Sequence, residues 1–154
     1  MADSVQERFA KLNTNLVLHN IRLYKFEASF DDEKINVSME ESKVYIDKNV
    51  YYQVVADNHV RVFQEFFFKV ALQNNPEEVL IKISPSYILD FQVGGPMDDE
   101  IFKIFADSTV LVDSWPYFRE IVQSTLLRMG LAPVVLPPIN FNPFVNVDAS
   151  AQSK

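Results

Sequence analysis

The chain has 154 residues and no cysteine, which excludes disulfide bonds, thiolate metal ligands and thiol catalysis. Its two histidines, His19 and His59, are far apart in the sequence, and neither has a second residue at metal-ligand spacing. Glycine is also scarce, and Gly94-Gly95-Pro96 is too short for a phosphate-binding loop. No apolar run approaches the ~20 residues of a membrane-spanning helix. The first fifteen residues lack the apolar core of a signal peptide, so we expect a soluble, cytoplasmic protein without direct membrane insertion.

Basic residues are outnumbered, with 14 Lys and Arg against 21 Asp and Glu and a formal net charge of −7. This charge disfavours nucleic acid as a partner. The paired acids at 31–32, 40–41 and 98–99 are adjacent rather than facing, as solvated loop and cap charges are. We therefore predict no enzyme, no cofactor and no metal site.

The hydrophobic content of 48% and the chain length predict a single folded domain over residues 1–154. Within it, residues 1–14 form an N-terminal helix or arm, because Ser4 and Glu7 make a capping-box pattern. Residues 146–154 are small and polar and should be a flexible tail.

From residue 16 the apolar period changes to two, which predicts strands at about 16–30, 35–39, 44–54, 60–72 and from 79 onward. Asp57-Asn58 and residues 73–76 are typical hairpin turns. We expect these strands to form a consecutive antiparallel meander.

Two helices should follow the strands. Asp98, Asp99 and Glu100 favour the start of a short helix. A second helix should begin near Asp113 or Ser114, tolerate Pro116 in its first turn and end at Gly130. The second helix has more apolar residues than the single stripe of a surface helix. They are Tyr117, Phe118, Ile121, Val122, Leu126, Leu127 and Met129. One side can pack on the sheet and the other indicates an oligomer; the alternative is a well-filled core.

A second apolar feature lies on the strand at 60–72. Phe63 and Phe67 point to the opposite sheet face from Phe66 and Phe68. That second face also has charged residues at 61, 65 and 69, so we expect it to be partly wet. Large exposed apolar patches normally mark binding surfaces.

Three segments resemble the SecB family of export chaperones: RLYKFEASFD at 22–31, WPYFRE at 115–120 and LPPINF at 136–141. They occur in the family's order and spacing, within a similarity that runs from about 16 to 145. The resemblance implies an α+β fold, a four-stranded antiparallel sheet packed by C-terminal helices. It also implies an ATP-independent holdase that binds unfolded or preprotein polypeptides for protein export and delivers them to the SecA motor. The family assembles as a homotetramer, a dimer of dimers, with the main helix at its centre.

The resemblance also implies roles for single residues. The family's SecA contacts correspond to Glu27, Asp31 and Leu80, and the alternative for the two acids is ordinary exposed strand charge. The client groove would be lined by Val79, Ile81 and Ile83 and by Phe141 and Phe144 of the tail, with sheet core as the alternative. The oligomer helix would use Tyr117, Phe118, Ile121, Val122 and Leu126.

The chain also departs from the family pattern. Lys82 replaces an acid of the expected SecA surface, residues 84–87 replace a Gln-Gln-Gly-Gly stretch, and the long acidic tail is missing. Prolines at 133, 137, 138 and 143 instead favour an extended tail. These departures question SecA coupling more than client binding. Two other functions therefore stay open: a dedicated chaperone for one client such as an antitoxin, and a small α+β domain whose apolar pocket holds a lipid or acyl group.

Overall fold

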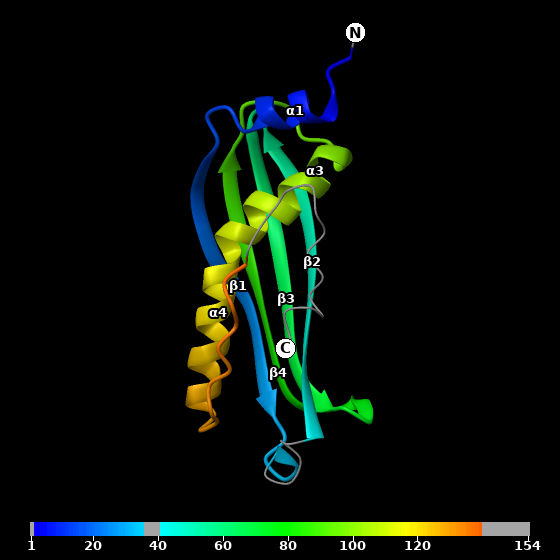
Figure 1. The fold of residues 1–154 in the computed structure, drawn as a ribbon. Coiled ribbons are helices and arrows are strands. Elements are labelled where there is room, and N and C mark those ends of the chain that lie inside the picture. The colour runs from blue at the N-terminus through cyan, green and yellow to red at the C-terminus, as the bar shows by residue number, and fades with distance from the viewer. Residues whose placement is uncertain (1, 36–40, 140–154) are drawn as a thin grey trace.

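The computed structural model describes residues 2–35 and 41–139. In this part of the chain, four long antiparallel strands form one sheet, and the helices α3 and α4 cover one of its faces (Figure 1). The elements in order are α1 (Val5–Leu12), β1 (Val17–Phe30), β2 (Ser42–Ala56), β3 (His59–Leu72), β4 (Asn75–Gln92), α3 (Asp99–Phe105), the π-helical turn η2 (Ala106–Val110) and α4 (Leu111–Arg128).

The sheet order is β1-β4-β3-β2. Strands β2, β3 and β4 form the expected meander, with one turn at 57–58 as predicted and the other at 73–74, inside the predicted range 73–76, because β4 already begins at Asn75. The full consecutive order does not hold, because β1 pairs antiparallel with β4 and not with β2. As a result β1 and β2 are the two edge strands, and each has one backbone edge without a partner among the described residues.

The prediction of a strand starting at Ile35 is not met at that residue. Ile35 is 3% exposed and helical, directly after the turn that follows β1, and its N–H donates to Asp31 O at 3.1 Å. The Asp31 carboxylate accepts hydrogen bonds from the backbone N–H of Glu33 and Lys34, and such a side-chain bond favours a turn over a strand. The rest of that predicted strand, 36–39, lies outside the described residues.

Strand β4 contains a proline although it lies between two neighbours. Pro85 has no N–H to donate to a ladder. Pairing with β3 reaches Ser86 opposite Glu65 and resumes only at Ile83 opposite Phe68. On the other side, Pro85 lies opposite Phe26 of β1. Residues 84–87, which differ from the family pattern, thus interrupt the pairing of β4 with β3 only locally. The strand itself continues to Gln92.

The helical part differs from the prediction at its start. The chain is helical without a break from Asp99 to Arg128, so α4 begins at Leu111 and Pro116 lies inside it. Its end agrees with the prediction, because Gly130 has a φ of 75° and Leu131 N donates to Leu126 O at 2.9 Å. The capping box of Ser4 and Glu7 is also formed.

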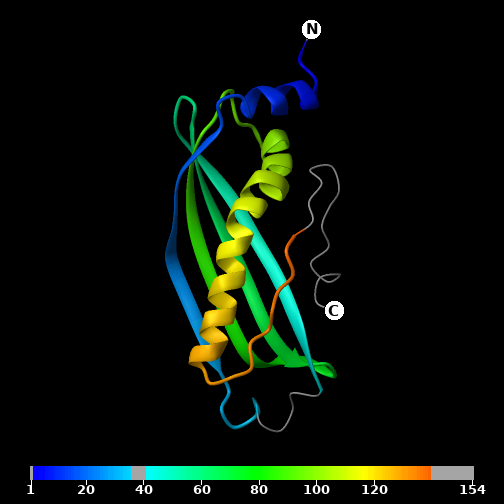
Figure 2. The same cartoon turned by 60° about the vertical axis from the view of Figure 1, so that its left-hand side comes forward.

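The core lies between the sheet and α4. Phe118, Val122 and Leu126 form the buried stripe of α4, and the Phe118 ring stacks on Phe66 of β3 with centroids 4.4 Å apart. α3 lies over β2, whereas the end of α4 lies beside β1 (Figures 1 and 2). After Gly130 the chain turns back, and residues 131–139 run along α4.

Candidate functional site

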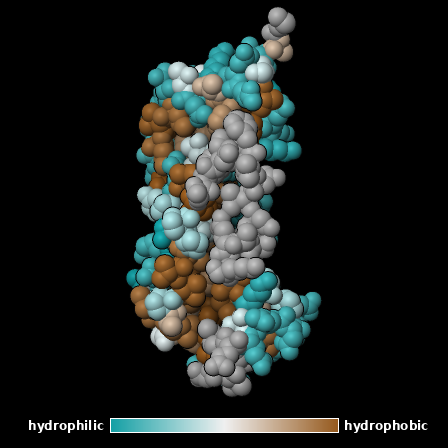
Figure 3. All heavy atoms as spheres, in the orientation of Figure 1, coloured by the Kyte–Doolittle hydropathy of each residue, from teal (hydrophilic) through white to brown (hydrophobic). Residues whose placement is uncertain are grey.

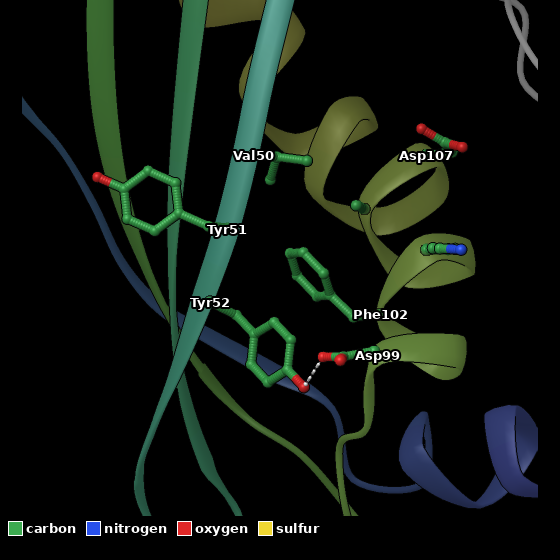
Figure 4. A pocket seen from close by; sticks show the side chains of 8 residues that line it. Val50, Tyr51, Tyr52, Asp99, Phe102 and Asp107 are labelled. Carbon is green, nitrogen blue, oxygen red and sulfur yellow. Dashed lines mark hydrogen bonds between the residues drawn. The ribbon is translucent and has the colours of Figure 1, made fainter.

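An open, largely apolar pocket of about 740 Å³ lies between the edge strand β2 and α3. Val50 and Tyr52 point into it from β2, and Phe102 points into it from α3 (Figure 4). The Tyr52 and Phe102 rings are 4.4 Å apart, whereas Tyr51 points to the other side of the strand. The remaining lining residues are Asp99, Lys103, Ala106 and Asp107.

The acids around this pocket have partners within the chain. The Tyr52 hydroxyl donates to Asp99 Oδ1 at 2.8 Å, and burial together with this carboxylate raises the pKa of Tyr52 to about 12. Lys48 Nζ donates to Asp107 Oδ1 at 3.2 Å. The pocket therefore offers an occupant mainly apolar surface.

Helix α1 holds the start of α3 in place beside the pocket. Asp98 caps α3 by accepting from Ile101 N at 2.9 Å, and Arg8 of α1 forms ion pairs with Asp98 and Glu100. Sequence reasoning missed the pocket because its two walls lie about fifty residues apart. The available signals were the shared face of Val50 and Tyr52 and the acids at the α3 start.

A second apolar surface lies along β1. Leu23, Phe26 and Phe30 are 44%, 42% and 37% exposed, and their partners in β4 place them on the face that α4 covers. Leu23 lies opposite Tyr87, whose ring is 6.2 Å from that of Tyr117 on α4. On this face, hydrophobic residues gather in an upper and a lower patch (Figure 3). Such patches normally mark sites of association.

The predicted oligomer helix divides into two groups. Phe118, Val122 and Leu126 are at most 1% exposed, so they belong to the core of their own chain. Tyr117 is 49% exposed and Ile121 is half-buried. Only these two of the five residues are open to a second subunit, and the role of the set in assembly stays a prediction.

The residues predicted to line the client groove also lie in different environments. Val79 is exposed, whereas Ile81 and Ile83 are core residues with at most 2% exposure. Phe141 and Phe144 lie outside the described residues. Client contacts by these five residues stay a prediction.

The three predicted SecA contacts lie near one end of β1. Asp31 N donates to Leu80 O at 2.9 Å, which brings these two residues together. Leu80 is 1% exposed, and the Asp31 carboxylate caps the turn after β1. Glu27 is exposed and faces Lys82, with Nζ 3.8 Å from Oε2. Lys82, which stands where the family has an acid, thus lies next to Glu27 and opposes its charge.

The sheet face without helices combines aromatic and charged residues, as predicted for Phe63 and Phe67. Phe63 is half-buried and stacks on Tyr51 with centroids 4.8 Å apart, and Tyr24 contacts it edge-on at 6.0 Å. A hydrogen bond with Tyr51 and burial raise the pKa of Tyr24 to about 12. Phe67 is 39% exposed. This face is therefore partly wet.

A charge cluster on the same face was not predicted, because its members come from three strands. The Asp90 side chain is 10% exposed. Arg61 Nε donates to it at 2.8 Å, and nitrogens of Arg22 and His59 lie 3.7 and 3.8 Å away. A buried carboxylate is tolerated when it is paired in this way. We see in this cluster a structural role.

Within residues 2–35 and 41–139, no group of three or more His, Asp or Glu side chains could hold a metal ion. In the same ranges no helix is long and apolar enough to cross a membrane.

The sequence was compared with known proteins, and no family model matches it. It is 31% identical over 108 residues to the protein-export protein SecB of Saccharophagus degradans. That match covers 70% of this chain and 62% of the relative, so the chain spans less than two thirds of that protein.

Two solved structures share the fold. The SecB-like chaperone of Mycobacterium tuberculosis, in complex with a peptide from an antitoxin, superposes with a TM-score of 0.69 at 16% identity, over 88% of this chain and 98% of that one. A protein of unknown function from Streptococcus agalactiae has a TM-score of 0.50 at 9% identity, over 80% and 97% of the two chains. The first match confirms the predicted SecB-like fold. The chain is thus similar in part of its sequence to a SecB protein, and it has the fold of a SecB-like chaperone.

Proposed function

We propose that this protein is an ATP-independent holdase chaperone, not an enzyme, that binds unfolded or preprotein polypeptides in the cytoplasm for protein export. The observation that carries the proposal is the apolar pocket beside the edge of β2. It lies where an extended chain could bind in a sequence-independent way. The relatives support the proposal, since those with assigned roles are an export protein and a chaperone in complex with a peptide.

The geometry suggests how a client binds. An extended segment adds to the outer edge of β2, which no other described strand pairs with, through main-chain hydrogen bonds, as in other cases of strand addition. Alternate side chains of such a segment point to the same face, so an aromatic one can enter the pocket against Tyr52 and Phe102. Apolar burial contributes roughly 25 cal/mol per Å², which needs no sequence code. Binding the unfolded client lowers its free concentration by mass action, without nucleotide.

A matched pair of variants on β2 tests this mechanism. Val50→Lys places a charge on the pocket wall, and we expect it to weaken binding of a labelled unfolded polypeptide by about tenfold or more. Gln53→Lys adds the same charge on the opposite face of the strand and should leave the affinity within about twofold. Fluorescence anisotropy gives the affinities, and circular dichroism checks that both variants fold. Equal affinities for both variants would remove the pocket from the mechanism.

A second candidate is a dedicated chaperone for one client, which the antitoxin peptide bound to the Mycobacterium relative favours. It predicts strong selectivity in a panel of unrelated unfolded proteins, whereas a general holdase binds most of them. The pocket also leaves room for the third candidate, a small apolar ligand. That candidate predicts a stoichiometric bound molecule in native mass spectrometry.

We also propose that the protein assembles through β1 and α4, as a dimer of dimers. One edge of β1 has no partner in the part of the chain that the structure describes, and Leu23, Phe26 and Tyr117 are exposed beside it. Pairing this edge with a second copy would remove an aggregation-prone feature of the single chain.

SecA is a further proposed partner, through Glu27 and Asp31. Reversing both charges to Lys should weaken SecA binding and leave client binding intact, because these acids lie away from the pocket. Isothermal calorimetry with SecA measures the first, and an unchanged SecA affinity would refute the assignment. Since Lys82 already faces Glu27, we expect the effect to come mainly from Asp31.

A further inference from the structure

We propose that the sheet face without helices binds an extended segment of a partner protein that carries an acidic and an aromatic residue two positions apart. The acid binds beside Arg22 and Arg61, and the aromatic ring packs against Tyr51 and Phe63. This surface lies on the other side of the sheet from the client pocket, because Tyr51 points away from that pocket (Figure 4). The inference therefore does not rest on the proposed function.

The strand register arranges this face in two neighbouring rows. Residues directly opposite one another in an antiparallel ladder point to the same face of the sheet. The first row has one residue from each strand: Tyr51, Phe63, Ile88 and Arg22. The second row lies two residues further along: Gln53, Arg61 and Asp90. Two residues of a strand span about 7 Å, so an aromatic row and a charged row lie at that separation.

The aromatic row has ring surface that the single chain leaves open. Tyr51 stacks on Phe63 with centroids 4.8 Å apart, and Tyr24 contacts Phe63 edge-on at 6.0 Å. Both tyrosines are nevertheless exposed. Aromatic pairs gain energy beyond the area that they bury. An aromatic side chain of a partner would therefore find its own kind of contact here.

The charged row has more positive charge than Asp90 neutralises. Arg61 Nε donates to Asp90 Oδ1 at 2.8 Å, and Arg22 Nη2 lies 3.7 Å from Asp90 Oδ2. Two partly exposed guanidinium groups thus surround one carboxylate, and neither has a further hydrogen bond or ion pair to the described residues. His59 Nε2 beside them is buried and has no hydrogen-bond partner within residues 2–35 and 41–139. The structural pairing of Asp90 therefore leaves donors for a second acid.

The balance of charge favours an acidic protein segment over nucleic acid. The chain as a whole has a net charge of −7, which repels a polyphosphate backbone. A single carboxylate is attracted by the local positive charge and can accept two parallel N–H bonds from one guanidinium. In an extended segment, residues two positions apart point to the same side and lie about 7 Å apart. This spacing matches the two rows, so the expected pattern is acid, any residue, aromatic.

Labelled peptides and fluorescence anisotropy test this pattern. The probe has Glu-Ser-Trp within a glycine-serine peptide. One control peptide replaces the Glu by Gln, and a second has the order Glu-Trp-Ser, which puts the two side chains on opposite sides of an extended chain. We expect the probe to bind about tenfold more tightly than either control, because only the probe makes both contacts at once.

Variants of the protein locate the binding surface. Arg22→Gln removes one guanidinium and Tyr51→Ala removes one ring, and each should weaken binding of the probe about fivefold or more. Arg128→Gln removes the same charge from α4 on the other side of the sheet and should leave the affinity within about twofold. Circular dichroism checks folding. Because Arg61 still pairs with Asp90, Arg22→Gln should fold, and Tyr51→Ala tests the surface independently.

Several results would overturn the proposal. Equal binding of the probe and the Gln peptide would do so, and so would equal losses in Arg22→Gln and Arg128→Gln. Tighter binding of an oligothymidylate than of the probe would assign the face to nucleic acid. A fall in the mass of the protein when the probe is added would assign it to a second copy.

The pocket variant Val50→Lys separates this proposal from the proposed function. It should bind the probe as the natural chain does, because Val50 lies on the pocket side of β2. A chain that binds the probe but no unfolded client supports this proposal and overturns the holdase function. A chain that binds clients but not the probe overturns this proposal and leaves the function standing.

Discussion

Gly94 has no side chain, and this allows the connection after β4 to contact the backbone at the end of α1. Gly94 N donates to Leu12 O at 2.8 Å, and a Cβ added at this position would lie 2.0 Å from Thr14 O. No rotamer change relieves this clash, because the atom it meets is backbone. At the neighbouring Gly95 an added Cβ would lie 3.4 Å from Lys11 Cγ, which is an ordinary contact.

We therefore expect Gly94→Ala to lower the free energy of unfolding by about 1–3 kcal/mol, since the loop must move away from α1. Gly95→Ala is the matched control and should change it by less than about 0.5 kcal/mol. Urea unfolding followed by circular dichroism measures both. Similar losses in the two variants would contradict the close approach at Gly94.

Asp113 is a half-buried acid within the continuous helical run, and its carboxylate has no hydrogen bond or ion pair to the described residues. Burial raises the pKa of this carboxyl group above its ordinary value of 3.8. A raised pKa means that the folded state binds the proton more tightly than the unfolded state. The contribution of Asp113 to stability is thus full below pH 3.8 and is lost as pH rises through the folded-state pKa.

It follows that Asp113→Asn should stabilise the protein at neutral pH, by no more than about 1 kcal/mol because solvent still screens the half-exposed charge. The difference between the variant and the natural chain should shrink as the pH falls toward 4. Thermal unfolding at several pH values measures it. A variant that is less stable at pH 7 would show that the charged carboxylate has a favourable partner.

At the scale of elements, the tail at 131–139 depends on α4 for its position. The Arg119 guanidinium and the Trp115 indole hold two consecutive carbonyl groups of the tail. Leu136 lies in the core beside them. This attachment explains how a proline-rich segment without internal hydrogen bonds stays on the fold.

Replacing Arg119 by Met keeps much of the apolar stem and removes the donor to Leu136 O. We expect a loss of about 1 kcal/mol of stability and faster proteolysis between residues 131 and 139. Arg128→Met on the same helix is the control, because Arg128 has no such bond to the described residues. If both variants resist the protease equally, the tail is held by its apolar contacts alone.

Elements that depend on neighbours in the sequence were predictable. The capping box at Ser4 and the αL glycine at position 130 need only local chemistry, and both occur as predicted. The pairing of β1 with β4 joins distant segments, so periodicity could not specify it. The same limit explains α4, which begins at Leu111 because α3 continues into it through a π-helical turn. A local start signal near Ser114 could not show that continuation.

The candidate site also combines features that local sequence predicts with features that depend on contacts between distant segments. The alternation of β4 identified Ile81 and Ile83 as apolar, but whether they face a groove or the core depends on what packs over them. The pocket requires the contact of Tyr52 with Phe102, which joins two segments fifty residues apart. The family resemblance supplied what local patterns could not, namely the sheet with helices on one face.

For the whole molecule, the two sheet edges suggest two separate uses. The β2 edge lies beside the pocket, which suits client segments, and the β1 edge lies beside exposed apolar residues, which suits a second copy. Such a division would let the protein assemble without blocking its own binding surface.

The most direct test of the central claim is light scattering from an aggregating unfolded protein, with and without this chain. The mass of the chain itself is determined in parallel by size exclusion with multi-angle scattering. We predict that an oligomer suppresses aggregation near stoichiometric amounts, without nucleotide. A well-folded chain that leaves aggregation of several unrelated clients unchanged, even in excess, would contradict the holdase function.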